Sequence, residues 1–258
     1  MSKTEAIQNS PVSEKEAPLT EHLTELRRRI LLSLGSIIVC AIFCYGFSHK
    51  LFTLLALPLE EVAPGTSLIF ISYPVAFFTY IKLAIVAGIF VASPFIMYQM
   101  WAFISPALYP HERRWAIPFI FLSSLFFIGG ALFGYFFIFP VLFKFLASYT
   151  NSNLKLMPEV NHYFALSMRL LLGFGFLFEF PLILIFLTFL GILSPTMLRK
   201  NRKYAILLIF IAAAILTPTP DIVHMILVAV PLIILYEISL LLMLLVGDRT
   251  KNKQEEES

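Results

Sequence analysis

Two carboxylates lie among arginines in this chain, where their chemistry would be the binding of a cationic group. Glu25 comes just before three consecutive arginines in "EHLTELRRR", and Glu112 comes directly before two in "PHERRW". A carboxylate binds a guanidinium through two parallel hydrogen bonds, a planar match that an ammonium group cannot reproduce. On a helix, however, Glu25 would also pair with Arg29 four residues later, for about 0.3–0.5 kcal/mol. The pattern leaves both interpretations open, a receptor for a cationic partner and a local charge pair.

A third carboxylate lies in the middle of an apolar stretch. Glu179 occurs in "FGFLFEFPLILIF", two residues before Pro181. An ionised acid at the bilayer centre costs about 2.5–3.5 kcal/mol even on the membrane-insertion scale. We therefore expect Glu179 to face a protein groove or water-filled cavity, or to hydrogen-bond as the neutral acid. A structural acid that joins two helices is the alternative, and it is the stronger interpretation for Glu237, nearer the end of its own stretch.

Motifs for catalysis and for cofactor or metal binding are absent from the sequence. It contains no Walker A, no H-E-x-x-H, no G-x-S-x-G and no Gly-rich dinucleotide turn. The five histidines are dispersed, and Cys40 and Cys44 stand four apart within one apolar stretch, as packing residues do. The net charge of +3 is scattered, whereas nucleic-acid binding needs a concentrated basic face. We expect a protein that is not an enzyme and binds no cofactor, metal or nucleic acid.

The composition is that of an integral membrane protein. Hydrophobic residues make up 59% of the 258, against about 45–50% in soluble domains, and the mean hydropathy is +0.86. A transmembrane helix needs about 20 apolar residues. Six stretches are candidates for spans: 30–48, 77–103, 115–139, 166–190, 204–216 and 222–246. The sequence predicts an all-α protein with six transmembrane helices, of which the fifth is short.

The segments outside these stretches complete the expected organisation. Residues 1–18 are polar and predict a disordered cytoplasmic tail, and the charged residues 247–258 predict a second, loose one. Apolar residues recur at helical spacing over 19–29, which predicts an amphipathic lead helix on the membrane surface. The first span is too long for a signal-peptide core of about 7–15 residues, so we expect it to be retained. The connections 50–76 and 144–163 predict ordered extracytoplasmic loops.

The positive charges predict the orientation of the chain in the membrane. With the N-terminus in the cytoplasm, 14 of the 19 Lys and Arg residues fall on the cytoplasmic side of six spans. Both termini are then cytoplasmic. The prolines inside spans favour kinked helices of unequal length, which predicts a concave scaffold with an exposed groove rather than a compact bundle. These span prolines are Pro94, Pro140, Pro181 and Pro231.

Six sequence blocks carry a resemblance to a known family. They are "HLTELRRR" (22–29), "LPL" (57–59), "SPFIMYQMWAFISPALYPHERR" (93–114), "FEFP" (178–181), "GILSPTMLRKNRKY" (191–204) and "LTPTPD" (216–221). The chain resembles TatC, the multi-spanning subunit of the twin-arginine (Tat) protein translocase, and the blocks occur in order over 19–246. One departure is the extra Thr-Pro before Asp221, and another is His224-Met225 in the place of a frequent Ser-Gln.

The resemblance implies a function and a set of site residues. The implied function is a receptor for signal peptides with consecutive arginines, which exports folded proteins across a bacterial cytoplasmic membrane using the proton gradient. The implied partners are twin-arginine signal peptides, single-span subunits of the TatA and TatB type, and further copies of the chain. The matching positions are Glu25, Glu112, Arg27 and Phe103 for signal-peptide binding, Glu179 and Pro181 for a partner groove within the membrane, and Pro58 and Asp221 in the outer loops and turn.

A proton-coupled secondary transporter of a small solute is the main alternative, with Glu179 as the coupling site. Transporter folds often contain internal repeats with paired broken helices. We find no such repeat in this sequence, which disfavours the alternative.

Overall fold

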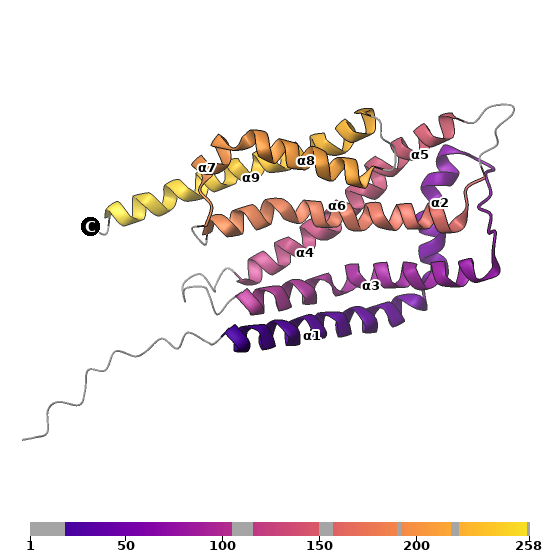
Figure 1. Ribbon diagram of the computed structural model, residues 1–258, viewed down its shortest axis with the longest axis horizontal. Coiled ribbons are helices and arrows are strands. Elements are labelled where there is room, and N and C mark those ends of the chain that lie inside the picture. The colour runs from indigo at the N-terminus through magenta and orange to yellow at the C-terminus, as the bar shows by residue number, and fades with distance from the viewer. Residues whose placement is uncertain (1–18, 105–115, 150–156, 190–191, 218–221, 257–258) are drawn as a thin grey trace, which may run out of the picture.

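The apolar stretches form helices that run side by side along the long axis of the molecule (Figure 1). The computed structural model describes residues 19–104, 116–149, 157–189, 192–217 and 222–256. Its helices are α1 Leu19–Tyr45, α2 Ser48–Val62, α3 Tyr73–Ile104, α4 Ala116–Phe133, the π-helix η3 Gly134–Ile138, α5 Phe139–Ser148, α6 Val160–Phe189, α7 Pro195–Lys200, α8 Arg202–Leu216 and α9 Ile222–Glu256. Within these ranges no strand is found, and an isolated bridge between Ile69 and Glu159 joins two connecting segments.

The all-α membrane class is confirmed. Five helical segments are long and apolar enough to cross a bilayer: Glu21–Tyr45, Tyr73–Ile104, Ala116–Ser148, Val160–Thr188 and Ile222–Leu241. The expected fifth span corresponds to α8, which has 15 residues and is shorter than any of these segments. At about 1.5 Å per residue, α8 extends over only about 22 Å, less than the hydrocarbon thickness.

The structure differs from the sequence-based boundaries at three helices. α1 continues without a break from Leu19, because no proline or glycine interrupts it before Gly35, so 19–29 is not a separate helix. The third stretch continues through η3 and α5 to Ser148, beyond the expected end at 139. Pro140 lies in the first turn of α5, where its missing N–H is tolerated. α9 remains helical to Glu256, where we expected a loose tail after 246.

The antiparallel pair of α1 and α3 determines where the start of α1 lies. A Cβ atom built on Gly88 of α3 would be 2.7 Å from the backbone nitrogen of Ala41, so the two helices pack too closely there for any side chain. Toward the other end of the pair, Arg29 of α1 meets Gln99 of α3. The same register brings the first turns of α1 beside the last turn of α3.

Around α6, the helices enclose a core of aromatic and aliphatic side chains. Phe164 and Phe174 of α6 are completely buried. α4 packs closely on α6, because a Cβ atom at Gly130 would collide with the carbonyl oxygen of Phe174. On the other side, Val228 and Tyr236 of α9 complete the same core. This packing fixes α4, α6 and α9 relative to one another.

The two ends of the molecule carry different elements. Figure 1 shows the start of α1, the end of α3, α7 and the end of α9 at one end, and α2 with its neighbouring connections at the other. α2 lies across the direction of the long helices (Figure 1). α8 and α9 lie against each other and run in opposite directions, so that α8 leads from the first end toward the second and α9 returns.

Candidate functional site

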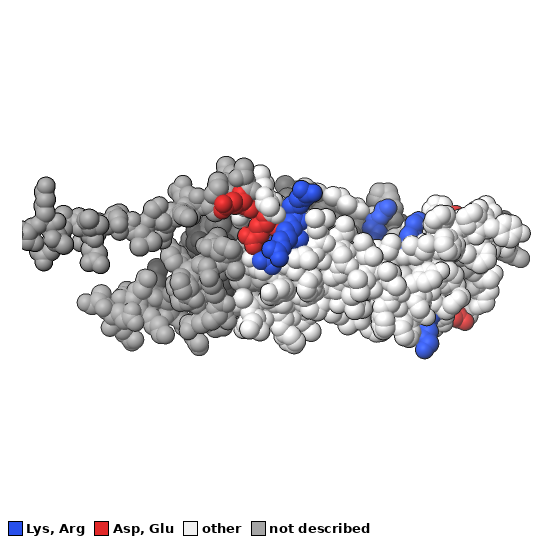
Figure 2. All heavy atoms as spheres, turned by 90° about the horizontal axis from the view of Figure 1, so that it is seen from below, with Lys and Arg blue, Asp and Glu red and all other residues white. Residues whose placement is uncertain are grey.

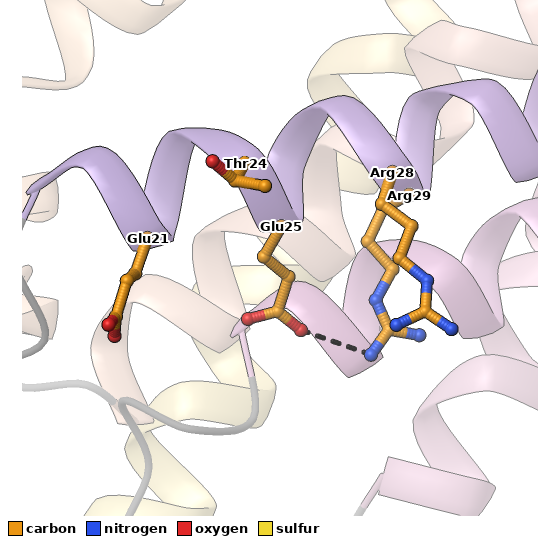
Figure 3. Close-up of a pocket in the computed structure, with 5 residues that line it drawn as sticks. All are labelled: Glu21, Thr24, Glu25, Arg28 and Arg29. Atoms are coloured by element: carbon orange, nitrogen blue, oxygen red, sulfur yellow. Dashed lines mark hydrogen bonds and ion pairs between the residues drawn. The ribbon is translucent and has the colours of Figure 1, made fainter.

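The first turns of α1 line a shallow hollow on the surface. Its volume is about 380 Å³, and its lining residues are Glu21, Thr24, Glu25, Arg28 and Arg29. These positions recur at intervals of three, one, three and one residues, the spacing of a single helical face. In the close-up, the carboxylates of Glu21 and Glu25 extend to the same side of α1, and the two arginines lie next to Glu25 (Figure 3). The hollow therefore presents two acids beside two guanidinium groups.

An ion pair and a hydrogen bond hold the charged side chains of the hollow in place. Arg29 Nη2 lies 3.1 Å from Glu25 Oε1, and the two side chains are 27% and 34% exposed. Arg29 Nη1 donates to Gln99 Oε1 over 2.9 Å, and Gln99 is buried in α3. The local pair that the helical spacing predicts for Glu25 is thus confirmed. Acids and arginines gather at this place on a side of the molecule that is otherwise mostly uncharged (Figure 2).

Two further predicted residues lie close to this hollow. Phe103, in the last turn of α3, stacks on His22 of α1 with ring centroids 4.4 Å apart and planes 26° apart. Arg27 is exposed on α1. Glu112 lies outside the described residues, eight positions after the end of α3 at Ile104. The structure therefore brings Glu25, Arg27 and Phe103 to one end of the α1–α3 pair.

Glu179 lies in a different place, between α4 and α6. Its side chain is only 6% exposed, and Pro181 is also buried. Ser123 Oγ of α4 donates a hydrogen bond to Glu179 Oε2 over 2.5 Å. The second carboxylate oxygen, Oε1, is buried and has no hydrogen-bond partner among the described residues. Glu179 therefore joins two helices, and its second oxygen is enclosed between them without a recorded partner in the described part of the chain.

The outer positions are separate from both of these places. Pro58 is buried within α2, at the end of the molecule opposite the start of α1 (Figure 1). Next to it, the hydroxyl of Tyr163 donates to the carbonyl oxygen of Leu55 over 2.7 Å, which attaches α2 to α6. Asp221 lies outside the described residues. His224, at one of the positions that depart from the family pattern, is buried against Phe145 with ring centroids 4.2 Å apart.

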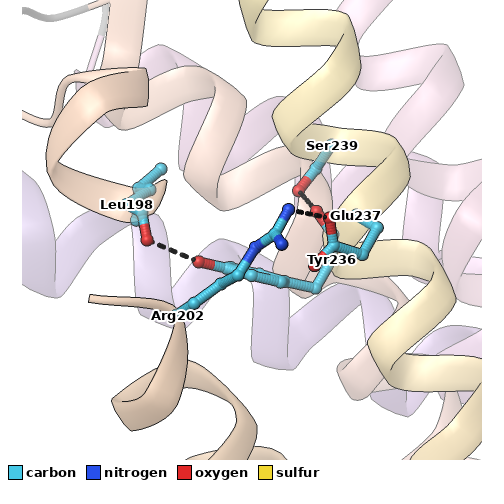
Figure 4. A network of polar contacts seen from close by, with 5 residues as sticks. All are labelled: Leu198, Arg202, Tyr236, Glu237 and Ser239. Carbon is cyan, nitrogen blue, oxygen red and sulfur yellow. Dashed lines mark hydrogen bonds and ion pairs between the residues drawn. The ribbon is translucent and has the colours of Figure 1, made fainter. Parts of the chain in front are cut away.

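A polar junction holds α7 and α8 against α9. Arg202 Nη2 lies 2.5 Å from Glu237 Oε2, and the Tyr236 hydroxyl donates to the carbonyl oxygen of Leu198 over 3.0 Å (Figure 4). Ser239 Oγ adds a bond to the carbonyl oxygen of Tyr236 over 2.7 Å. This geometry favours the structural interpretation of Glu237. No group of three or more His, Cys, Asp or Glu that could hold a metal occurs within the described ranges.

Sequence reasoning missed three of the polar partners around these residues. Gln99 contacts Arg29, the ion-pair partner of Glu25. Ser123 contacts Glu179, and His22 stacks on Phe103. The available signal was weak for each of them. Gln99 and Ser123 are uncharged polar residues within apolar stretches, and His22 resembles any histidine at a span edge. Only the pairing of helices shows which side chain each of them contacts.

Comparison with known proteins decides the family. The model of the family "Sec-independent protein translocase protein (TatC)" matches residues 21–231. The chain belongs to the TatC family. The TatC protein of Desulforapulum autotrophicum is 41% identical over 244 residues, which cover 94% of this chain and 90% of the relative. The TatC protein of Escherichia coli strain K12 is 36% identical over 243 residues, 94% of each chain.

Solved TatC structures resemble this fold. A crystal structure of the twin-arginine translocase receptor TatC is 38% identical in sequence, covers 88% of this chain and 99% of its own, and has a TM-score of 0.76. A second one, crystallised in the detergent DDM, has a TM-score of 0.77. TatC is a component of a protein translocase, so its role is in transport and not in catalysis. The transporter of a small solute is therefore not favoured.

Proposed function

We propose that this chain is the signal-peptide receptor and core subunit of a twin-arginine translocase, which exports folded proteins across a bacterial cytoplasmic membrane using the proton gradient. The observation that carries the proposal is the charged hollow at the start of α1, where Glu21 and Glu25 lie beside Arg28 and Arg29 and close to Phe103. The family membership and the matching crystal structures of a twin-arginine translocase receptor support it.

In this proposal, Glu25 and Glu112 each bind one guanidinium group of an incoming peptide. Glu112 lies eight positions after the end of α3, and an extended chain of eight residue steps reaches at most about 29 Å. Because α3 ends beside the start of α1, the connection is long enough to place Glu112 near Glu25. The neighbouring arginines would repel peptides whose positive charge does not reach the acids, which adds selectivity.

Photocrosslinking tests where the peptide binds. A photoreactive residue at Glu21, in the hollow, should crosslink to a twin-arginine signal peptide added to the full-length protein. The same residue at Ile71, which is 76% exposed at the opposite end of the molecule, should not. An excess of unlabelled twin-arginine peptide should remove the crosslink at Glu21, and a twin-lysine peptide should remove it less. Equal crosslinking at both positions would contradict a receptor site on α1.

We further propose six spans with both termini in the cytoplasm. Two observations support termini on the same side: the start of α1 and the end of α9 lie at the same end of the molecule, and α8 and α9 run in opposite directions. A single cysteine at Thr66, between α2 and α3, should react with a membrane-impermeant maleimide from outside intact cells. A cysteine at Asn201, between α7 and α8, should react only after the cells are opened. Labelling of Asn201 in intact cells would contradict the six-span topology.

The partners belong to the same proposal. Single-span Tat subunits and further copies of the chain would assemble around it on a concave scaffold of kinked helices, with Glu179 close to a partner helix within the membrane. The Glu179 Oε1 atom lacks a hydrogen-bond partner among the described residues, so a polar group of a partner could satisfy it once a local shift of the helices exposes this buried oxygen. The short α8 supports a local thinning of the bilayer or shielding by a neighbouring helix.

A further inference from the structure

The contacts of Arg29 raise a question about the proposed receptor. Glu25, the acid that should bind an incoming guanidinium, already contacts a guanidinium of its own chain, with 3.1 Å between Arg29 Nη2 and Glu25 Oε1. The peptide must therefore displace Arg29 or share the carboxylate with it. Two unit charges of the same sign at one carboxylate repel each other, so displacement is favoured over sharing.

We infer that Arg29 competes with the incoming peptide for Glu25, while Gln99 holds the Arg29 guanidinium in place. This competition makes the receptor selective for guanidinium groups. The inference rests on the proposed function, because it concerns the same acid. In the unliganded protein, one nitrogen of Arg29 contacts one oxygen of Glu25, whereas a peptide guanidinium can contact both oxygens. A cation binds only if it contacts Glu25 better than Arg29 does, and a bidentate guanidinium meets this condition while an ammonium group does not.

Gln99 gives Arg29 a second hydrogen-bond partner, which lowers the free-energy cost of displacing Arg29 from Glu25. Gln99 is only 4% exposed on α3, and its Oε1 accepts from Arg29 Nη1 over 2.9 Å. The third nitrogen, Nε, is buried and has no partner within the described part of the chain. Glu25 and Gln99 therefore supply the hydrogen bonds that the structure records for this guanidinium. When a peptide takes Glu25, the bond to Gln99 keeps Arg29 partly satisfied and away from the peptide.

The inference predicts effects of opposite sign from two substitutions at one position. Gln99→Glu places a carboxylate against Arg29 Nη1, draws Arg29 away from Glu25 and should strengthen peptide binding. Gln99→Met keeps the volume of the side chain but removes the acceptor, so Arg29 depends on Glu25 alone and peptide binding should weaken. A role for Gln99 in packing alone would make both variants weaker or leave both unchanged.

The test is a fluorescence titration of labelled twin-arginine and twin-lysine peptides into the purified full-length protein. Arg29→Gln should lower the Kd of the twin-arginine peptide by about two- to five-fold, the factor that corresponds to a partly exposed ion pair. It should lower the Kd of the twin-lysine peptide more, so that the preference for arginine decreases. Arg28→Gln is the matched control, since it removes the same charge from the same hollow and leaves the Glu25–Arg29 pair in place.

The outcomes separate this inference from the proposed function. If Glu25→Ala abolishes binding but Arg29→Gln binds no more tightly than Arg28→Gln, the competitor role is wrong and the receptor stands. If Glu25→Ala binds like the parent, the receptor itself is wrong, and no exchange at Glu25 takes place. Support requires an Arg29→Gln variant that binds more tightly than Arg28→Gln, and opposite shifts of the Kd for the two Gln99 variants. Thermal unfolding of each variant checks that the fold is retained.

Discussion

Replacing Glu25 or Glu112 by alanine is expected to abolish the binding of a twin-arginine signal peptide while the protein still inserts and folds. Each charge-assisted contact contributes about 1.5–3 kcal/mol, so two of them contribute about 3–6 kcal/mol. The loss of one contact corresponds to about one to two decades in Kd, and the loss of both to about two to four decades. Equilibrium binding of a labelled peptide to the purified protein measures the loss, and charge reversal by Glu112→Lys should weaken binding further than alanine does.

Glu21→Ala provides the control for the Glu25 variant. Glu21 lines the same hollow and carries the same charge, but the resemblance to TatC assigns signal-peptide binding to Glu25. Replacing Glu21 should change the Kd only through the long-range electrostatic attraction between the hollow and the cationic peptide. The change should be a small factor that added salt reduces further. If the Glu25 and Glu112 alanine variants bind the twin-arginine peptide as tightly as the parent, and do not distinguish it from a twin-lysine peptide, both acids are ordinary surface charges.

Replacing Glu179 by leucine should lower export strongly, whereas Glu179→Gln should insert normally and bind signal peptide. Glutamine retains the shape and an oxygen that accepts from Ser123 Oγ, while leucine removes both acceptors and any contact that Oε1 makes with a partner. Loss of one such contact, at about 1.5–3 kcal/mol, raises the Kd for the partner about ten- to hundred-fold. The rate of export of a folded reporter in cells measures the effect. A fully active Glu179→Leu variant would show that the acid serves no partner.

A matched pair of serines separates the structural contribution of Glu179 from its proposed partner. Ser123→Ala removes the donor to Glu179 Oε2 and should cost about 1–3 kcal/mol in the free energy of unfolding, because a buried acceptor is left unpaired. Ser124, on the same helix, is also buried but donates to the carbonyl oxygen of Ile120 in its own helix, so its replacement should cost less stability than that of Ser123. Equal effects of the two variants on stability would show that the bond to Glu179 contributes nothing to it.

The class of the fold and the identity of the candidate acids could be predicted from the sequence. Apolar stretches near 20 residues long have few alternatives to a membrane helix, since lipid offers no partner for an exposed backbone. The helical spacing of Glu25 and Arg29 likewise predicts their ion pair, because residues four apart share a face whatever the helix packs against. These features depend on the local chain alone.

The boundaries of the helices were less predictable. α1 is a single helix from Leu19 to Tyr45, although its first third is polar and its remainder apolar. A change in polarity does not end a helix unless a residue such as proline interrupts its hydrogen bonds. Pro140, in turn, did not end the third helical segment, because the π-helix η3 precedes it and its own position falls in the first turn of α5.

The partners of the acids depended on the tertiary structure. From the sequence alone, Gln99 and Ser123 are polar residues in apolar stretches, 70 and 56 positions away from Arg29 and Glu179. The close approach of α1 and α3 at Gly88, and of α4 and α6 at Gly130, sets the register that brings each pair together. The sequence by itself determined which residues carry charge and which stretches form helices, because those properties are local. The tertiary structure decided which side chain contacts which acid, because the contact requires two helices to pack in one register out of many.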